Sequence, residues 1–329
     1  MKSSSLQNKY YFLMVFVCNH FFITKYLLYF LYQIASDQAI YYLLFSIFLI
    51  LISTYYLIKK DIFPLFFELK KTQKKCLSLY LFFLQLFSII TLTHFIKIHW
   101  LINTPLLFIL IPFYSLIYYG LKQPLNVLYK TLGYLFPILL ITLSLFYFKK
   151  LAYLSLINVN LTFTNHSFIQ ALFLSLFIFL QTHFALFIPI PSYFQVSKKS
   201  YLYSIFVLIF LILLETWIET NEFSTLLEII RFPFFESFNT IYFGQYIGYQ
   251  HIPVLFIYLI GAFFLNTTSI HLFDQINTPS RTFVFFILNL ILCFLFLQYE
   301  TTFQALLYPL LGLTYFFLFL SYLFYFIRK

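Results

Sequence analysis

The run Tyr201–Ile218, YLYSIFVLIFLILLETWI, carries a single charged side chain, Glu215, in 18 residues. A helix that crosses a bilayer needs about 20 predominantly apolar residues, so we expect this run to be a membrane-spanning helix. The sequence therefore predicts an all-α, polytopic transmembrane helical bundle, with residues 1–329 forming a single integral membrane domain. Nine further apolar runs are bounded by charged or turn residues: Tyr10–Ile34, Ile40–Ile58, Leu77–Ile98, Trp100–Tyr119, Leu128–Phe148, Phe168–Ile188, His251–Leu265, Thr282–Gln298 and Phe303–Ile327.

The composition of the chain excludes the other broad classes of protein. Apolar residues make up 62% of the 329 residues and charged residues only 9%, whereas a soluble domain carries roughly 25% charged residues. The same apolar content excludes a disordered chain, which is poor in hydrophobic residues and rich in charge. The chain has 50 Phe and 29 Tyr but only 6 Gly, although helix packing in membranes favours small residues. This bias matches AT-rich codons and favours an organelle or endosymbiont gene.

One short apolar piece, Leu151–Phe163, leaves the number of spans at ten or eleven. Its 13 residues are too few to cross alone and read as re-entrant or interfacial. With ten spans, most basic residues fall on one side and the acidic stretch Glu219–Glu236 falls on the other, as the positive-inside rule expects. Lys149 and Lys150 are the exceptions, because they share the acidic side. With eleven spans this asymmetry weakens, and both counts stay open.

Ionisable side chains inside the predicted spans are candidates for function, because a charge in hydrocarbon is costly. Glu215 and Glu219 lie four residues apart on one helix face; they either relay protons with a lysine or mark a helix end that meets the acidic loop. The alternative for Lys97 and Lys130 is snorkelling from a span end. The alternative for His183 is a hydrogen bond to a neighbouring carbonyl, without a role in function. The full set is Lys25, His94, Lys97, Lys130, His183, Glu215 and Glu219.

Sequence motifs of enzyme chemistry are not found in this chain. It has no GxSxG, HExxH or phosphate-loop motif. The three cysteines, Cys18, Cys76 and Cys293, form no CxxC pair, which argues against a disulfide scaffold or a zinc site. The seven histidines, His20 among them, show no repeated spacing that would place two facing pairs for haem. We therefore expect no catalytic residue, no metal site and no redox cofactor on this chain.

Three short stretches, in order along the chain, carry a family resemblance. The first is Ser36–Leu44, SDQAIYYLL; the second is Ile98–Trp100, IHW, followed by Lys122 and Pro124; the third is Lys149–Ser155, KKLAYLS. Together they resemble motifs of NADH dehydrogenase subunit 2, an antiporter-like membrane subunit of respiratory complex I. The resemblance covers about residues 36 to 190 and is weaker beyond them. It also makes Leu151–Phe163 a genuine span, which favours eleven.

The resemblance implies a multi-pass subunit of the mitochondrial inner membrane that contributes to proton translocation, while electron transfer occurs in other chains. The implied partners are other membrane subunits of a large respiratory complex and lipids, with no nucleic acid. No cofactor is expected on this chain, although bound cardiolipin near the Lys70–Lys75 cluster is plausible. The candidate residues of the proton path are Lys122, Lys130, Lys97, His94 and Glu215.

The chain departs from the family pattern at three places that concern the proton path. The family's lysine before the His-x-Trp turn would fall near Thr91 or Thr93, although Lys97 is close. The family's glutamate in an early span has no match around Lys25–Tyr29. The family's late broken helix, which contains Gly-Pro-Pro and lysine, corresponds to Glu215–Thr225, where glycine and proline are missing. If the resemblance holds, the proton path is either rewired or lost.

Two other classes of protein stay open. One is a divergent ATP synthase subunit a, in which Arg231 or Arg281 would face a proton ring; Gln304 and Ala305 faintly match the final helix of that family. The other is a purely structural membrane subunit in which every lysine is a snorkeller.

Overall fold

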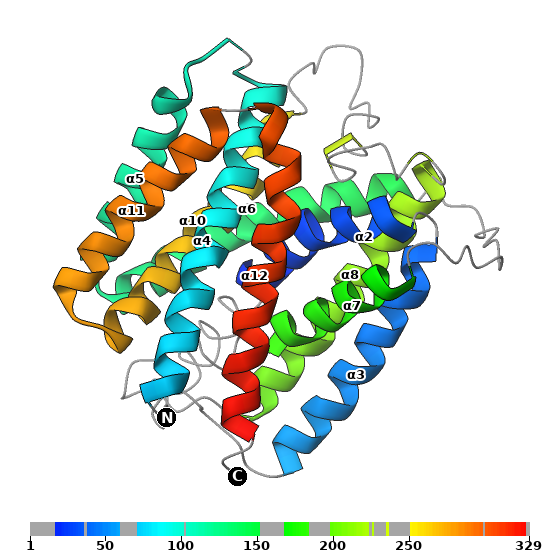
Figure 1. Ribbon diagram of the computed structural model, residues 1–329. Helices are drawn as coiled ribbons and strands as arrows, with labels where there is room; N and C mark the ends of the chain where they lie inside the picture. Colours follow the sequence, from blue (N-terminus) through cyan, green and yellow to red (C-terminus); the bar gives the residue numbers. More distant parts are fainter. Residues whose placement is uncertain are drawn as a thin grey trace. The chain divides into compact units, whose positions relative to one another are not determined.

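A computed structural model of the chain describes residues 17–35, 38–59, 71–101, 103–151, 168–183, 198–223, 226, 235–236, 251–298 and 300–326. Within these residues the regular structure is helical throughout, with no strand (Figure 1). The predicted all-α class is confirmed. The helices are η1 (Ile23–Leu27), α2 (Leu28–Ala35), α3 (Ala39–Lys59), α4 (Lys71–His99), α5 (Leu106–Lys122), α6 (Leu125–Leu151), α7 (Phe168–Thr182), α8 (Lys198–Phe223), α10 (His251–Ile276), α11 (Pro279–Gln298) and α12 (Glu300–Phe326).

The helices have the length and apolarity of membrane spans. Six of them, α3, α4, α6, α8, α10 and α11, are long and apolar enough to cross a bilayer, and α5, α7 and residues Pro309–Leu323 of α12 are shorter apolar helices. Each of the ten predicted runs overlaps one of these helices or the segment formed by residues 17–22, η1 and α2. The fold is thus that of a multi-pass helical membrane protein. Of the predicted short piece Leu151–Phe163, all but Leu151 lies outside the described residues.

Contacts divide the chain into two compact units. Unit 1 comprises Met1–Phe63, Tyr129–Ala185 and Ser192–Gly261, and unit 2 comprises Pro64–Leu128, Leu186–Pro191 and Ala262–Lys329. Each is described by itself below. That the whole chain forms one integral membrane domain stays a prediction.

In unit 1, helix α3 packs against α7 and α8, and η1 and α2 pack against α7. Close approach of α3 and α7 is made by two serines: the Ser46 hydroxyl donates to the Ser175 carbonyl at 2.8 Å. Small hydroxyl residues at helix crossings allow the two backbones to approach closely. Their hydroxyl groups also form hydrogen bonds across the contact in a membrane. In Figure 1, α3 is blue, α7 is green and α8 is yellow-green.

Two side-chain contacts join α6 and α8 near the ends of both helices. Tyr147 of α6 contacts Glu215 of α8, and further along both helices Lys150 contacts Glu222, with Nζ 2.6 Å from Oε1. Glu222 thus balances the charge of Lys150. The number of spans, ten or eleven, stays a prediction.

In unit 2, α4 lies at the centre. It packs along α12 and also against α11 and α5, and Figure 1 shows α4 and α12 side by side. Of its most apolar 18-residue window, 72% is buried, against 28% for α11. A helix that is apolar on all sides is expected to be buried on all sides. Gly120 of α5 permits a close contact with α10, because a Cβ there would lie 2.9 Å from a methyl group of Thr267.

The first described segment contains a π-helical turn. In η1 the N–H of Leu28 donates to the carbonyl of Ile23, five residues back. Such turns are rare and are found frequently at functional sites. This one begins three residues after His20, the first residue of the site described next.

Candidate functional site: a buried carboxylate and histidine cluster

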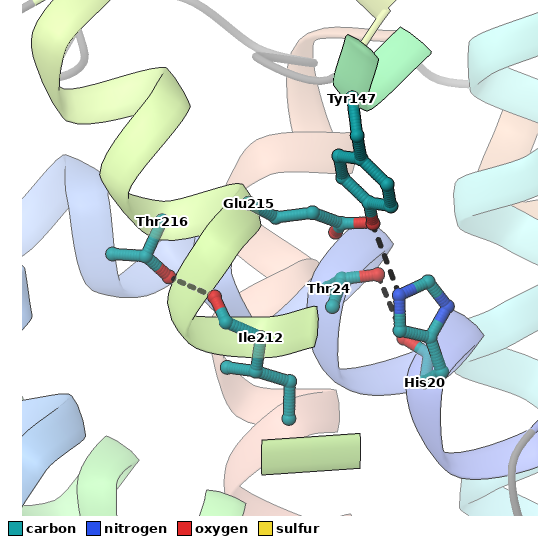
Figure 2. Close-up of polar contacts among 6 residues, drawn as sticks. All are labelled: His20, Thr24, Tyr147, Ile212, Glu215 and Thr216. Atoms are coloured by element: carbon teal, nitrogen blue, oxygen red, sulfur yellow. Dashed lines mark hydrogen bonds and ion pairs between the residues drawn. The ribbon is translucent and has the colours of Figure 1, made fainter. Parts of the chain in front are cut away.

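Three side chains from three helical segments of unit 1 meet at one carboxylate oxygen. His20 Nε2 lies 3.0 Å from Glu215 Oε1, and the Tyr147 hydroxyl donates to the same oxygen at 2.6 Å. Figure 2 shows the imidazole and the phenol converging on the Glu215 carboxylate. His20 and Glu215 are 4% and 1% exposed. We call His20, Tyr147 and Glu215 the buried triad.

Neighbouring hydroxyl groups bond within their own helices. Thr24 Oγ1 donates to the His20 carbonyl at 2.7 Å, and Thr216 Oγ1 donates to the Ile212 carbonyl at 2.8 Å (Figure 2). Back-bonding of this kind satisfies a threonine hydroxyl inside a helix and often bends the helix. These two threonines thus support the backbone beside the triad.

A second buried carboxylate lies one helical turn beyond the triad. Glu219 is 1% exposed, and it acts electrostatically on Tyr147 as well as on the fully buried Tyr32 of α2. Two carboxylates in a low-dielectric interior disfavour each other's ionised form. Such a pair is stable with a shared proton or with a cation such as a protonated histidine. The site is therefore suited to hold and exchange a proton.

The mostly buried ion pair Lys150–Glu222 continues the acidic face of α8. Its side chains are 11% and 19% exposed. Glu215, Glu219 and Glu222 follow one another at intervals of four and three residues, so they lie along one face of the helix. The carboxylates thus lead from the buried triad towards the end of α8.

Another buried histidine in unit 1 bonds to hydroxyl groups, and the expectation of a carbonyl partner was wrong. His183 Nδ1 lies 2.6 Å from the Tyr201 hydroxyl of α8, and Nε2 lies 2.6 Å from Ser53 Oγ of α3. The imidazole is 3% exposed and Tyr201 is fully buried. Both ring nitrogens therefore have partners on other helices.

Of the five predicted proton-path residues, only Glu215 belongs to the buried triad. Lys122 is exposed, and its Nζ lies 4.6 Å above the centre of the Tyr118 ring. Lys130 is exposed on α6, and Lys97 is half-buried near the end of α4. His94 is buried in α4 of unit 2. The two lysines on which the resemblance places most weight thus lie at the surface of the structure.

Sequence reasoning missed His20 and Tyr147. The signal for His20 was present, because it lies inside the predicted span Tyr10–Ile34 and an ionisable residue at membrane depth is a candidate for function. Tyr147 is one of 29 tyrosines and nothing local distinguishes it. Arg281, the candidate for an ATP synthase role, is exposed in the first turn of α11, and Arg231 lies outside the described residues.

Among the residues that the structure describes, no group of three or more His, Cys, Asp or Glu side chains is arranged to hold a metal ion. The three cysteines are buried as free thiols. No protein-family model matches the sequence, and neither the curated proteins nor the solved structures include a match.

Proposed function

We propose that this chain is a proton-translocating membrane subunit of a mitochondrial NADH:ubiquinone oxidoreductase, similar to subunit 2 and embedded in the inner membrane. The observation that carries the proton-transfer part is the buried triad, in which His20 and Tyr147 meet at Glu215 Oε1. The three resembling stretches and the AT-biased composition support the family and the location.

The triad moves a proton between two atoms. Glu215 Oε1 accepts a proton from His20 Nε2 over 3.0 Å, which turns an imidazolium and a carboxylate into two neutral groups. The Tyr147 hydroxyl donates to the same oxygen and stabilises its ionised form. A change in charge nearby shifts this equilibrium, since electrostatic interactions are strong in a low-dielectric interior. Glu219, one turn away and equally buried, is the acceptor for the next step.

The acidic face of α8 gives this transfer a direction. From Glu215 the carboxylates continue to Glu219 and Glu222, and Lys150 compensates the last of them. This arrangement replaces the central lysines of the family with glutamates and a histidine, which corresponds to a rewired path. An anionic lipid such as cardiolipin at the exposed Lys71, Lys74 and Lys75 of α4, and neighbouring membrane subunits, are further parts of the proposal.

The proton-transfer role is tested in inner-membrane vesicles that carry a variant chain assembled in its complex. Glu215→Gln keeps the size of the side chain but cannot exchange a proton. We expect it to lower NADH-driven acidification per NADH oxidised by at least about 100-fold, a typical contribution of a positioned acid or base. The matched control is Asp274→Asn, a half-buried carboxylate of unit 2 that accepts from the Thr282 hydroxyl at 2.8 Å. Unchanged acidification in Glu215→Gln would leave the purely structural subunit as the better account.

The identity of the complex is tested separately, by native electrophoresis of detergent-solubilised membranes. We expect the chain to migrate with NADH dehydrogenase activity. Migration with rotary ATPase activity would contradict the proposal and favour the ATP synthase alternative.

A further inference from the structure

We propose that Ser53, His183 and Tyr201 form a second proton-transfer site in unit 1, a hydroxyl–imidazole–hydroxyl relay that connects the outer face of α3 with the interior holding the buried triad. This inference rests on the proposed function, because it assigns a further station to the same proton path. It adds residues that neither the composition nor the family resemblance indicated.

The hydrogen-bond distances of the relay are short on both sides of the His183 ring. The two imidazole nitrogens lie 2.6 Å from hydroxyl oxygens of two different helices, Ser53 of α3 and Tyr201 of α8. Hydroxyl groups donate and accept at the same time, and a neutral imidazole has one donor and one acceptor nitrogen. A chain of such groups can pass a proton from one end to the other.

The hydrogen bonds fit one continuous direction. Ser53 Oγ also lies 3.0 Å from the Ile50 carbonyl, to which its hydroxyl donates. With the imidazole protonated at Nε2, Tyr201 donates to Nδ1, Nε2 donates to Ser53, and Ser53 donates to Ile50. Every donor in this row has an acceptor.

A transfer through the row conserves protons at each group. The Tyr201 hydroxyl gives its proton to His183 Nδ1 while Nε2 gives its proton to Ser53 Oγ. Ser53 releases its own proton to a water molecule at the Lys59 end of α3, and a water molecule that carries a proton from the buried triad restores the Tyr201 hydroxyl. Rotation of the hydroxyl groups and exchange of the imidazole tautomer reset the row. The reverse sequence carries a proton inward.

The two ends of the row differ in exposure, which gives the relay a path. Ser53 is half-buried, and it stands between the exposed residues Ile52 and Tyr55, which are 51% and 68% exposed. Tyr201 at the other end is fully buried. The relay therefore begins at the outer face of α3 and ends inside unit 1, where α3, α7 and α8 are neighbours (Figure 1).

One hydrogen bond links the two segments that carry the histidines of the relay and of the buried triad. Thr182 precedes His183, and its carbonyl accepts a 3.0 Å hydrogen bond from Asn19 Nδ2, the residue before His20. Both histidines are thus positioned by the same contact between α7 and the first helical segment. Along α8, Tyr201 and Glu215 are separated by about 21 Å of helix, at 1.5 Å per residue. Together the two sites cover much of the length of a membrane-spanning helix.

The test uses inner-membrane vesicles that carry each variant chain assembled in its complex. Proton flux is the NADH-driven acidification per NADH oxidised, followed with a pH-sensitive dye. The variants are Tyr201→Phe and Ser53→Ala, which each remove one oxygen atom, and His183→Gln. Controls remove buried hydroxyl groups of unit 2: Tyr114→Phe, which loses a 2.7 Å bond to Asn289, and Ser269→Ala, which loses a 2.7 Å bond to the Leu265 carbonyl. Thermal unfolding of every variant is recorded beside its flux.

We expect each relay variant to lower proton flux at least about tenfold and the Tyr201→Phe, Ser53→Ala double variant to lower it no further, since the groups act in series. The controls keep their flux even where they lower thermal stability. Unchanged flux in both Tyr201→Phe and Ser53→Ala, with flux lost in Glu215→Gln, overturns the relay alone. Unchanged flux in Glu215→Gln with flux lost in the relay variants overturns the triad and retains the relay. No flux in the unmodified chain, or equal flux in all variants, overturns both.

Discussion

The two units of this chain bury different kinds of polar side chain. Among its described residues, unit 1 buries two carboxylates and two histidines, Glu215, Glu219, His20 and His183. Among the described residues of unit 2, the buried polar side chains are amides, hydroxyls and one histidine, His94, with no carboxylate. Groups that exchange protons are costly in hydrocarbon, whereas neutral amides and hydroxyls only need a hydrogen-bond partner. Among the described residues, the buried carboxylates therefore lie in unit 1, where we propose that proton transfer occurs.

The neutral polar groups of unit 2 hold its helices together. Asn289 of α11 accepts from the Tyr114 hydroxyl of α5 at 2.7 Å and donates to the Phe82 carbonyl of α4 at 3.2 Å. Ser88 of α4 donates to Asn266 of α10 at 2.9 Å. One amide thus connects three helices without any charge. On the proposed function, buried polar groups serve proton transfer in unit 1 and hold helices together in unit 2.

The largest effect is expected where packing supports the triad. A Cβ at Gly261 would lie 2.2 Å from the ring of Phe21, the residue after His20, at the ring atom nearest the backbone. The phenylalanine cannot swing away at that atom, so Gly261→Ala forces a backbone shift. We expect it to lower the free energy of unfolding by about 3 kcal/mol and to lower proton flux, because His20 moves from Glu215. Thermal unfolding in detergent and vesicle flux measure the two effects.

Two other glycines are controls for this variant. At Gly120 of unit 2 the Cβ would meet only the Thr267 methyl group and the far end of Phe263, so we expect a smaller loss of stability and unchanged flux. At Gly312 nothing lies within 4 Å, and we expect no loss. Loss of flux in Gly120→Ala would contradict the separation of roles between the units.

The second prediction tests cohesion in unit 2. Asn289→Ala removes the acceptor of the Tyr114 hydroxyl and the donor to the Phe82 carbonyl, and it leaves both buried groups without these bonds. We expect the free energy of unfolding to fall by about 2 kcal/mol while proton flux per folded chain stays unchanged. Reduced flux in a folded Asn289→Ala protein would place unit 2 in the proton path and break the comparison.

The smallest effect is expected at the end of α8. Lys150→Met removes the partner of Glu222, and because both side chains keep some exposure we expect a loss of about 1 kcal/mol. Chemical denaturation at low and high salt measures it, and the loss should shrink at high salt. Lys59→Met, an exposed lysine at the end of α3, is the control and should change nothing. An equal loss in both variants would mean that the ion pair with Glu222 contributes no stability.

The helices could be predicted from the sequence because hydropathy alone determines where a chain crosses a bilayer. The predicted run Tyr201–Ile218 lies within α8, Lys198–Phe223, and Glu215 was found because a charge in an apolar run is costly. The partners of Glu215 were not found, since they depend on how each helix is rotated about its axis. Lys122 and Lys130 are exposed, because a long side chain near a helix end reaches the surface easily, and their place on a proton path stays a prediction.

The π-helical turn η1 determines which side chains of the first helical segment face α8. His20 and Tyr32 are separated by 12 positions, which in an uninterrupted α-helix places them about 120° apart around the axis. One extra residue in a π turn takes up about 100° of that angle, so the two side chains point within about 20° of each other. This is why side chains of one segment, His20 and Tyr32, lie near Glu215 and Glu219 of α8. Deleting a single residue between 23 and 27 would leave the amino-acid composition almost unaltered, yet it would turn one of the two side chains away from its acid.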